Sequence, residues 1–419
     1  MRHLLALPLL MLLPSSRAAD VVFVPNYDEA KIPAFTLPDP LKMQDGAPVT
    51  TPEQWRDKRR PEILRLFGEH VFGVTPTGAP AEMRAEVTSE GPALGGLALR
   101  REVTLHFRRA GAELNARVLI LLPAKRKGPA PAFLGLNFKG NHTVCTDEGV
   151  TIHPDVHERG KEVLPRGAES GPWQAEMILK RGYALVTCWY GDFDPDFDDG
   201  FHNGPHPLFQ APGWTAPAPD EWGSIGAWAW GCSRMLDCAA GDRDLDAKRV
   251  ALIGHSRLGK AALWAGAQDE RFALVISNNS GCGGAALSRR AIGETVGRIN
   301  RSFPHWFCDR HNDYNENENA CPVDHHELLA LIAPRPLYVA SAEDDKWADP
   351  KGEFLGALGA DPVYRLLTGE GLDAKEMPPV NQPVSGRVSY HIRTGKHDVT
   401  AYDWEQYLAA ADRWLPPSD

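Results

Sequence analysis

A serine stands where an apolar stretch of the sequence gives way to a helical pattern. In RVALIGHSRLGKAALWAG, residues 249–266, we expect a buried strand, a sharp turn at Ser256 and then a helix. A serine hydroxyl exposed at the end of a strand can act as a nucleophile when a base and an orienting carboxylate lie nearby. The usual turn of this kind reads G-x-S-x-G, but here Gly254 is in place and the second glycine, Gly259, comes one residue late.

Two basic residues after the serine favour a functional role over a purely structural turn. Arg257 and Lys260 fall in the first turn of the expected helix, where the helix dipole disfavours a cation by about 0.3–1 kcal/mol. A second Gly-Xaa-Ser-Arg sequence, at residues 231–234, lies inside an apolar helical pattern with no strand before it. We therefore expect Ser233 to pack within a helix and Ser256 to be the nucleophile.

His397 is the best candidate for the base. It follows the last expected strand and precedes a C-terminal helical pattern, whereas His391 lies inside that strand. The chain order of α/β-hydrolases is Ser, then Asp or Glu, then His. That order excludes three histidines that precede the acidic candidates: His305, His325 and His326.

Three carboxylates compete for the role of the acid that orients the base. Glu343, Asp344 and Asp345 come directly after an apolar run that reads as a strand. One of them can reach the histidine, and the residues alone leave the choice open.

The elements that must position these side chains are predicted by recurrent apolar runs. We expect seven strands, at ARVLILLPA, APAFLGLNF, YALVTCWYG, RVALIGHS, FALVISNNS, RPLYVASAE and VSYHIRTG. Helical patterns, including residues 221–240 and 260–267, separate several of them. Continuous apolar strands that alternate with helices indicate an α/β fold, with a mostly parallel sheet covered on both faces. Ligands of such sheets bind beyond the carboxyl ends of the strands, where the candidate residues fall.

Length and charge narrow the classes of function. The 419-residue chain is 43% hydrophobic and carries a formal net charge of −10, and we expect one catalytic domain over residues 20–419. Its acidity argues against nucleic acid and anionic membranes as partners. Among its seven cysteines, Cys308 and Cys321 flank a polar loop and can pair in an oxidising compartment. The sequence contains no C-x-x-C pair, so it does not suggest a zinc site.

The first 19 residues, MRHLLALPLLMLLPSSRAA, have the pattern of a secretory signal peptide. A basic start, an apolar run of ten residues and small residues near Ala18 and Ala19 follow one another. The run is too short to span a bilayer. We expect export to the periplasm or the medium, and no membrane anchor.

With these pieces in hand, the chain resembles the bacterial glucuronoyl esterases, carbohydrate esterase family 15 of the α/β-hydrolase superfamily. The family signature G-x-S-R-x-G-K is matched by Gly254, Ser256, Arg257, Gly259 and Lys260. Four further segments are similar to the family: NNSGCGGAAL, HWFC, LIAPRPLYVAS and GKHDVTAYDW. The resemblance implies a three-layer αβα sandwich, and it makes the late glycine an expected feature.

The resemblance also implies roles for individual residues. Arg257 would contribute its backbone N–H and its side chain to the oxyanion hole. Lys260, Glu294 and Trp347 would contact a glucuronate ring. In some bacterial members the triad acid lies two residues before the sugar-contacting tryptophan, which assigns that role here to Asp345.

Two departures from fungal members matter. Many of these carry the acid at the position of Asn279, whose neutral amide cannot stabilise an imidazolium by charge. A fungal disulfide joins the positions of His255 and Asp398, so that bridge is absent and we expect packing alone to hold the turn.

The function implied is hydrolysis of esters between glucuronate or 4-O-methylglucuronate groups of glucuronoxylan and lignin alcohols, through an acyl-enzyme. We expect no metal or organic cofactor, and a monomer. Two alternatives stay open. One is an acetyl or other carboxylesterase acting on hemicellulose, which would not explain Lys260 and Glu294. The other is a non-catalytic carbohydrate-binding homologue in which Asn279 marks a decayed triad.

Overall fold

The computed structural model describes residues 23–76, 82–156, 162–211 and 213–418. Nine strands form a single sheet in the order β1-β2-β3-β5-β4-β6-β7-β8-β9. Strands β1 to β3 and the β3–β5 pair are antiparallel, and every other neighbouring pair is parallel. Their bounds are β1 Glu82–Ala93, β2 Ala98–Arg109, β3 Ala112–Pro123, β4 Ala130–Asn137, β5 Ala184–Trp189, β6 Leu245–His255, β7 Leu274–Asn278, β8 Leu337–Ala342 and β9 Val388–Arg393.

The seven expected strands are present as β3 to β9, whereas β1 and β2 were not predicted. Strand β1 is largely exposed, and β2 alternates buried and half-buried residues along most of its length. Neither strand carries a continuous apolar run, because each is covered on one face at most.

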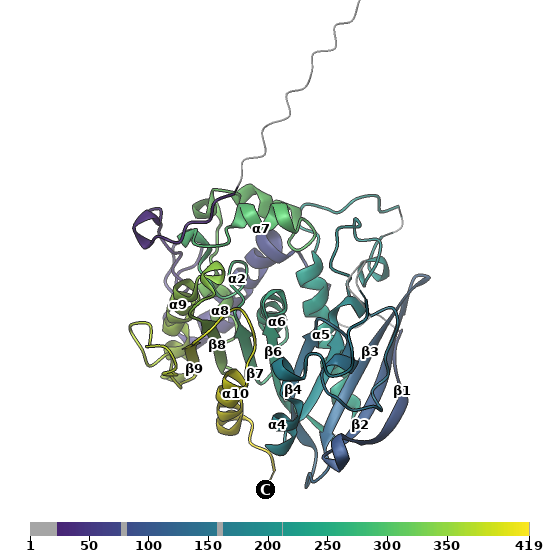
Figure 1. Cartoon of the computed structure of the whole chain (residues 1–419). Helices are drawn as coiled ribbons and strands as arrows, with labels where there is room; N and C mark the ends of the chain where they lie inside the picture. The colour runs from purple at the N-terminus through teal and green to yellow at the C-terminus, as the bar shows by residue number, and fades with distance from the viewer. Residues whose placement is uncertain (1–22, 77–81, 157–161, 212, 419) are drawn as a thin grey trace, which may run out of the picture.

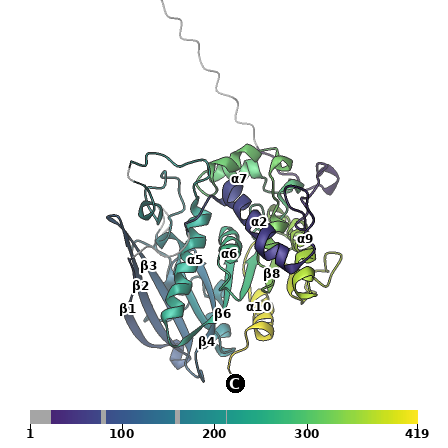
Figure 2. The ribbon, with the colours of Figure 1, turned by 180° about the vertical axis from the view of Figure 1, so that it is seen from behind.

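Successive residues of each central strand enter two separate cores, one on each face of the sheet. In β3, Val118 and Ile120 belong to the core that includes α2, α5, α6, α8 and α9, whereas Leu119 and Leu121 belong to the core with α4 and α10. Figure 1 views the molecule from the side of α10, and Figure 2 from the side of α2 and α5. The expectation of a three-layer αβα sandwich is confirmed.

Ten α-helices are assigned within the described residues. The helical patterns expected near residues 221–240 and 260–267 are α5 and α6. The bounds are α1 Pro52–Gln54, α2 Arg60–Phe67, α3 Ser170–Trp173, α4 Ala175–Lys180, α5 Ser224–Gly241, α6 Arg257–Gln268, α7 Val296–Ser302, α8 His325–Ala330, α9 Pro350–Thr368 and α10 Ala401–Trp414.

The predicted pairing of Cys308 with Cys321 is wrong in this structure, because both residues are free thiols. The loop between them folds into two short 3₁₀ helices, η9 Asp309–Tyr314 and η10 Glu318–Ala320. The Cys308 N–H donates to Val71 O, while Cys321 O accepts from the Arg289 guanidinium, so the two ends of the loop are held by different partners.

The predicted signal peptide, residues 1–19, lies outside the described residues. In the part of the chain that is described, no helix combines the length and the apolar composition that crossing a membrane requires.

Candidate functional site

Four neighbouring parallel strands bring the candidate residues to one edge of the sheet. Ser256 directly follows β6, and Asn279 directly follows β7. Asp345 and His397 lie three and four residues beyond the ends of β8 and β9. Because the carboxyl ends of parallel strands meet at the same edge, residues far apart in the sequence converge there.

Ser256 occupies a strained turn between β6 and α6. Its backbone has φ 57° and ψ −129°, a conformation that an L-residue adopts only when its surroundings impose it. The Ser256 N–H donates to Asn278 O at 2.9 Å, and Ser256 O accepts from the N–H groups of Gly259 and Lys260. This is the geometry that presents a serine hydroxyl above the end of a sheet.

Both glycines of the turn lie at close contacts, which exclude a side chain at Gly254 and leave little room for one at Gly259. A Cβ at Gly254 would lie 1.9 Å from Leu258 O, so no side chain fits there. A Cβ at Gly259 would lie 3.0 Å from the Ser280 side chain and 3.1 Å from Gly254 O. Leu258, where the usual second glycine would stand, is buried in the core instead. In this turn the residue that lies close to the loop after β7 is therefore Gly259, one position later than in the usual G-x-S-x-G turn.

His397 and Asp345 form a direct pair. His397 Nδ1 lies 2.6 Å from Asp345 Oδ2, and the His397 side chain keeps 42% exposure while that of Asp345 keeps 5%. Burial acts to raise the pKa of the Asp345 carboxyl, but the contacts with His397 and Asn279 outweigh it and lower that pKa. Asp345 is therefore ionised at neutral pH.

The other two acidic candidates of this loop are solvent-exposed, unlike Asp345. Glu343 and Asp344 are exposed, and their backbone N–H groups donate to Arg393 O, at the end of β9, and to Gly395 O, in the loop after β9.

Asn279 stands where many fungal members carry the triad acid, and its side chain contacts the Asp345 carboxylate. Its Nδ2 donates to Asp345 Oδ2 at 2.8 Å, the oxygen that also meets His397. The neutral amide thus supports the carboxylate from the adjacent strand end, where a second acid would repel it.

The Arg257 guanidinium is held by a carboxylate that was not predicted from the sequence. Asp196 accepts hydrogen bonds from Arg257, from Trp306 Nε1 at 2.7 Å and from His305 Nε2 at 2.9 Å. Burial acts to raise the pKa of the Asp196 carboxyl, but the His305 hydrogen bond and the charge of Arg257 lower it. The guanidinium also lies 4.8 Å from the Trp306 ring centroid. No local pattern marks Asp196, because it lies 61 residues before Arg257.

The residues expected to contact a sugar lie near Arg257. Lys260 is buried, and its Nζ donates to Ser280 O at 2.6 Å. Burial lowers the pKa of Lys260 and raises that of Glu294, and the attraction between the two charges opposes both shifts. Glu294 also accepts a hydrogen bond from the Trp347 side chain, and its N–H donates to Trp347 O at 3.0 Å. Trp347 is 36% exposed, so its ring is accessible to a ligand.

A cavity of about 300 Å³ opens beside the serine. Ser256, Arg257 and His397 share its wall with the aromatic residues Phe138, Trp173, Tyr190 and Trp404. Lys260, Glu294 and Trp347 are not part of this wall. The aromatic cavity and the charged cluster of Lys260 and Glu294 are therefore separate features of the site.

The remaining serine and histidine candidates are not part of the cavity wall, and His305 is the one that contacts Asp196. Ser233 lies within α5, and His391 is fully buried in β9. His305, His325 and His326 are buried. Within the described residues, no group of three or more His, Cys, Asp or Glu side chains is arranged to hold a metal ion.

The expectation that packing alone holds the turn is wrong. His255 Nδ1 lies 2.6 Å from Asn278 Oδ1, and the His255 and His397 rings are 4.5 Å apart between centroids. Burial, together with the nearby His397, lowers the pKa of His255 to about 3, so this ring is neutral at physiological pH. Polar contacts therefore anchor the residue before the serine.

Comparisons with known proteins identify the family to which the chain is similar. Residues 217–368 match a family model described as glucuronyl esterase of fungi. A carbohydrate esterase from an unknown prokaryotic organism is 49% identical over 399 residues, which are 93% of this chain and 92% of that protein. The solved structure of a glucuronoyl esterase from Solibacter usitatus is 50% identical with a TM-score of 0.88, covering 92% of this chain and 100% of that one. A 4-O-methyl-glucuronoyl methylesterase of Schizophyllum commune is 28% identical over 79% of this chain and 73% of its own.

Proposed function

The chain belongs to carbohydrate esterase family 15, the glucuronoyl esterases, and is a carboxylic ester hydrolase; from this premise we propose that it cleaves esters of glucuronate or 4-O-methylglucuronate. The proposed natural substrate is glucuronoxylan whose uronate groups are esterified with lignin alcohols. The observation that carries the proposal is the convergence of strained Ser256 with the His397–Asp345 pair on one cavity, beside the Lys260 and Glu294 charges.

The proposed reaction is acyl transfer in two steps. His397 takes the proton of the Ser256 hydroxyl, whose oxygen attacks the ester carbonyl. Collapse of the tetrahedral intermediate breaks the bond to the alcohol oxygen, which leaves with the proton from His397. Water then attacks the acyl-serine with His397 again as base, and releases the uronic acid and the free serine. Asp345, ionised and bonded to His397 Nδ1, orients the ring and stabilises its protonated form.

Arg257 is proposed to stabilise the negative oxygen of both intermediates. Its backbone N–H opens α6, where helical N–H groups lack acceptors within the helix. Its Nε is buried and has no hydrogen-bond partner within the described residues. A donor aimed at a developing oxyanion contributes about 3–4 kcal/mol.

Lys260, Glu294 and Trp347 are proposed to bind the hydroxyl-bearing face of the uronate ring. A lysine and a glutamate together offer a donor and an acceptor, which suits neighbouring hydroxyl groups. The indole of Trp347 offers an apolar face at the same place. An acetyl group has nothing for these residues to bind, so the cluster favours a uronate over an acetate.

The alcohol is proposed to leave through the aromatic cavity. His397 must protonate the departing oxygen, and the cavity wall includes His397 together with Phe138 and Trp173. Aromatic walls suit an aromatic alcohol. No step needs a metal or an organic cofactor.

A comparison of two esters tests the substrate class. We expect the wild-type protein to hydrolyse benzyl glucuronate with a higher kcat/KM than phenyl acetate. Glu294→Gln should lower kcat/KM for the glucuronate by about 10- to 100-fold, the value of a hydrogen bond to a charged group, and leave acetate hydrolysis within twofold. Glu343→Gln, in an exposed residue of the Asp345 loop, serves as the control. Faster release of acetate, from phenyl acetate or from acetylated xylan, would contradict the proposal.

Export through the residue 1–19 signal peptide and action as a monomer complete the proposed function. Both fit an enzyme that must reach an insoluble polysaccharide outside the cell. Cleavage of the leader on expression in a secreting host, and the mass of the purified protein in solution, test them.

A further inference from the structure

The loop that carries His397 is held by the last residue of β9. The Arg393 side chain is only 3% exposed, and its guanidinium donates to three backbone carbonyls of the loop. These are Thr394 O at 3.1 Å, Lys396 O at 3.1 Å and Asp398 O at 2.6 Å. The carbonyls lie on both sides of His397 in the chain, so one rigid, planar group shapes the loop around this residue.

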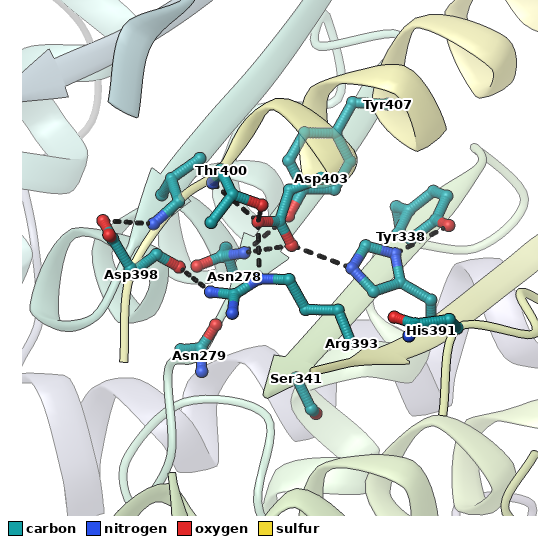
Figure 3. A network of polar contacts seen from close by, with 12 residues as sticks. Asn278, Asn279, Tyr338, Ser341, His391, Arg393, Asp398, Thr400, Asp403 and Tyr407 are labelled. Carbon is teal, nitrogen blue, oxygen red and sulfur yellow. Dashed lines mark hydrogen bonds and ion pairs between the residues drawn. The ribbon is translucent and has the colours of Figure 1, made fainter. Parts of the chain in front are cut away.

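Asp403 in α10 holds Arg393 and the far end of the same loop. Its carboxylate is fully buried and accepts from Arg393 Nε at 2.7 Å and from His391 Nε2 at 2.9 Å. It also accepts from the backbone N–H and the hydroxyl of Thr400, both at 2.7 Å, as part of the capping box of α10. Figure 3 shows these groups converging on the Asp403 carboxylate.

Asn278 connects this cluster to the turn at Ser256. Its Nδ2 donates to Asp403 Oδ1 at 3.3 Å and to Tyr407 Oη at 2.7 Å. Its Oδ1 meets His255 Nδ1 at 2.6 Å, and its backbone O accepts from Ser256 N at 2.9 Å. A continuous chain of polar contacts therefore runs from the serine turn through Asn278, Asp403 and Arg393 to the histidine loop.

We propose that Arg393 and Asp403 are positioning residues that set the place of His397 relative to Ser256. The inference rests on the proposed role of these two residues as base and nucleophile. His397 lies in an exposed loop, and loops move more than the sheet that supports them. Proton transfer from the serine needs the ring held to within about 0.5 Å. The network supplies that restraint because its hydrogen bonds connect the Ser256 turn to the loop that carries His397.

The competing explanation is that a buried ion pair serves stability alone, and Arg59 offers a matched control. The Arg59 side chain is 4% exposed and contacts Glu327 at 2.6 Å. It also donates to two backbone carbonyls, Pro40 O and Asp39 O, both at 3.2 Å. Arg59→Gln and Arg393→Gln thus remove similar buried groups, but only the second lies beside the histidine loop.

The experiment measures stability and chemistry separately in both variants, at a temperature well below their melting points. We expect both substitutions to lower Tm. Arg393→Gln should also lower kcat for benzyl glucuronate by about 10- to 100-fold, the effect of a misplacement of the order of 1 Å, with KM within twofold. Arg59→Gln should keep kcat within twofold. Arg393→Lys should recover part of the Tm but little of kcat, because an ammonium group cannot hold three carbonyls in one plane.

Two further readouts do not depend on the substrate. The rate at which a fluorophosphonate labels Ser256 should fall in Arg393→Gln and not in Arg59→Gln. Hydrogen exchange of the backbone amides of residues 394–400 should speed up only in Arg393→Gln. If the fluorophosphonate labels the wild type but the wild type does not cleave benzyl glucuronate, the proposed substrate is wrong. The labelling rate and the hydrogen exchange of the variants still test the positioning role of Arg393 in that case. The inference would be overturned if folded Arg393→Gln kept the labelling and exchange rates of the wild type. It would also be overturned if Arg59→Gln lost as much kcat as Arg393→Gln.

Discussion

At the scale of single residues, Asp345 Oδ2 is the atom on which the site depends most. This oxygen accepts hydrogen bonds from His397 Nδ1 at 2.6 Å and from Asn279 Nδ2 at 2.8 Å. In the proposed triad, the first contact orients the base, and the second holds the acceptor in place. Asn279 is therefore a donor to the Asp345 carboxylate in this structure, and Asp345 can supply the acid that is missing at position 279 in the proposed triad.

Replacing Asp345 with asparagine should preserve the shape of the loop and remove its charge. We predict that Asp345→Asn lowers kcat for benzyl glucuronate by about 10³- to 10⁴-fold, because a neutral amide neither stabilises the imidazolium nor selects the productive tautomer of the ring. Steady-state kinetics measure this loss. Asp344→Asn, in the exposed neighbour, should change kcat less than twofold. Equal losses in both variants would show that the acid has been misassigned.

At the scale of elements, the segments after β6, β7, β8 and β9 carry Ser256, Asn279, Asp345 and His397, and α9 contacts both β8 and the loop after β7. Glu353, in α9, accepts from Ser341 Oγ at 2.6 Å and from Gly281 N at 3.0 Å. Ser341 belongs to β8, and Gly281 to the loop that carries Asn279 and Ser280. Burial raises the pKa of the Glu353 carboxyl to about 8, against an ordinary value of 4.5.

This shift predicts how the stability of the protein changes with pH. Between pH 4.5 and 8 the folded protein keeps the Glu353 proton that the unfolded chain loses. The free energy of unfolding therefore decreases as pH rises through that range, by up to about 1.4 kcal/mol per unit. Glu353→Gln has no proton to lose, so its Tm relative to wild type should rise between pH 5 and pH 8. Parallel melting curves of the two proteins over that range would contradict this.

The sequence predicts these elements where burial leaves a local pattern. The parallel strands β4 to β9 are apolar runs, and their order in the chain is enough to bring Ser256, Asp345 and His397 to one edge. Contacts between distant polar residues leave no such pattern. Asp196 reaches Arg257 across 61 residues, and Asn278 reaches Asp403 across 125, so both became visible only in the fold.

At the scale of the whole molecule, one sheet and its two cores hold the fold together without a disulfide. All seven cysteines are free thiols, and six of them are buried. Burial raises the pKa of Cys308 to about 11 and that of Cys321 to about 12, which keeps both thiols protonated and unreactive.

Thiol counting tests this organisation. We predict that the unreduced protein shows seven reactive thiols in denaturant and few in the native state, where burial blocks the reagent. Its Tm should be the same with and without a reducing agent. Five thiols in the denatured, unreduced protein, together with a Tm that falls on reduction, would restore the pairing of Cys308 with Cys321.

The account as a whole depends on a glucuronoyl group passing through Ser256. Rapid quenching of the wild-type protein with benzyl glucuronate, followed by mass spectrometry of the intact chain and its peptides, detects that intermediate directly. We predict a transient adduct of one glucuronoyl group on the peptide that contains Ser256, absent in Ser256→Ala, which should release no benzyl alcohol above background. Release of the alcohol by folded Ser256→Ala at the wild-type rate would contradict the account.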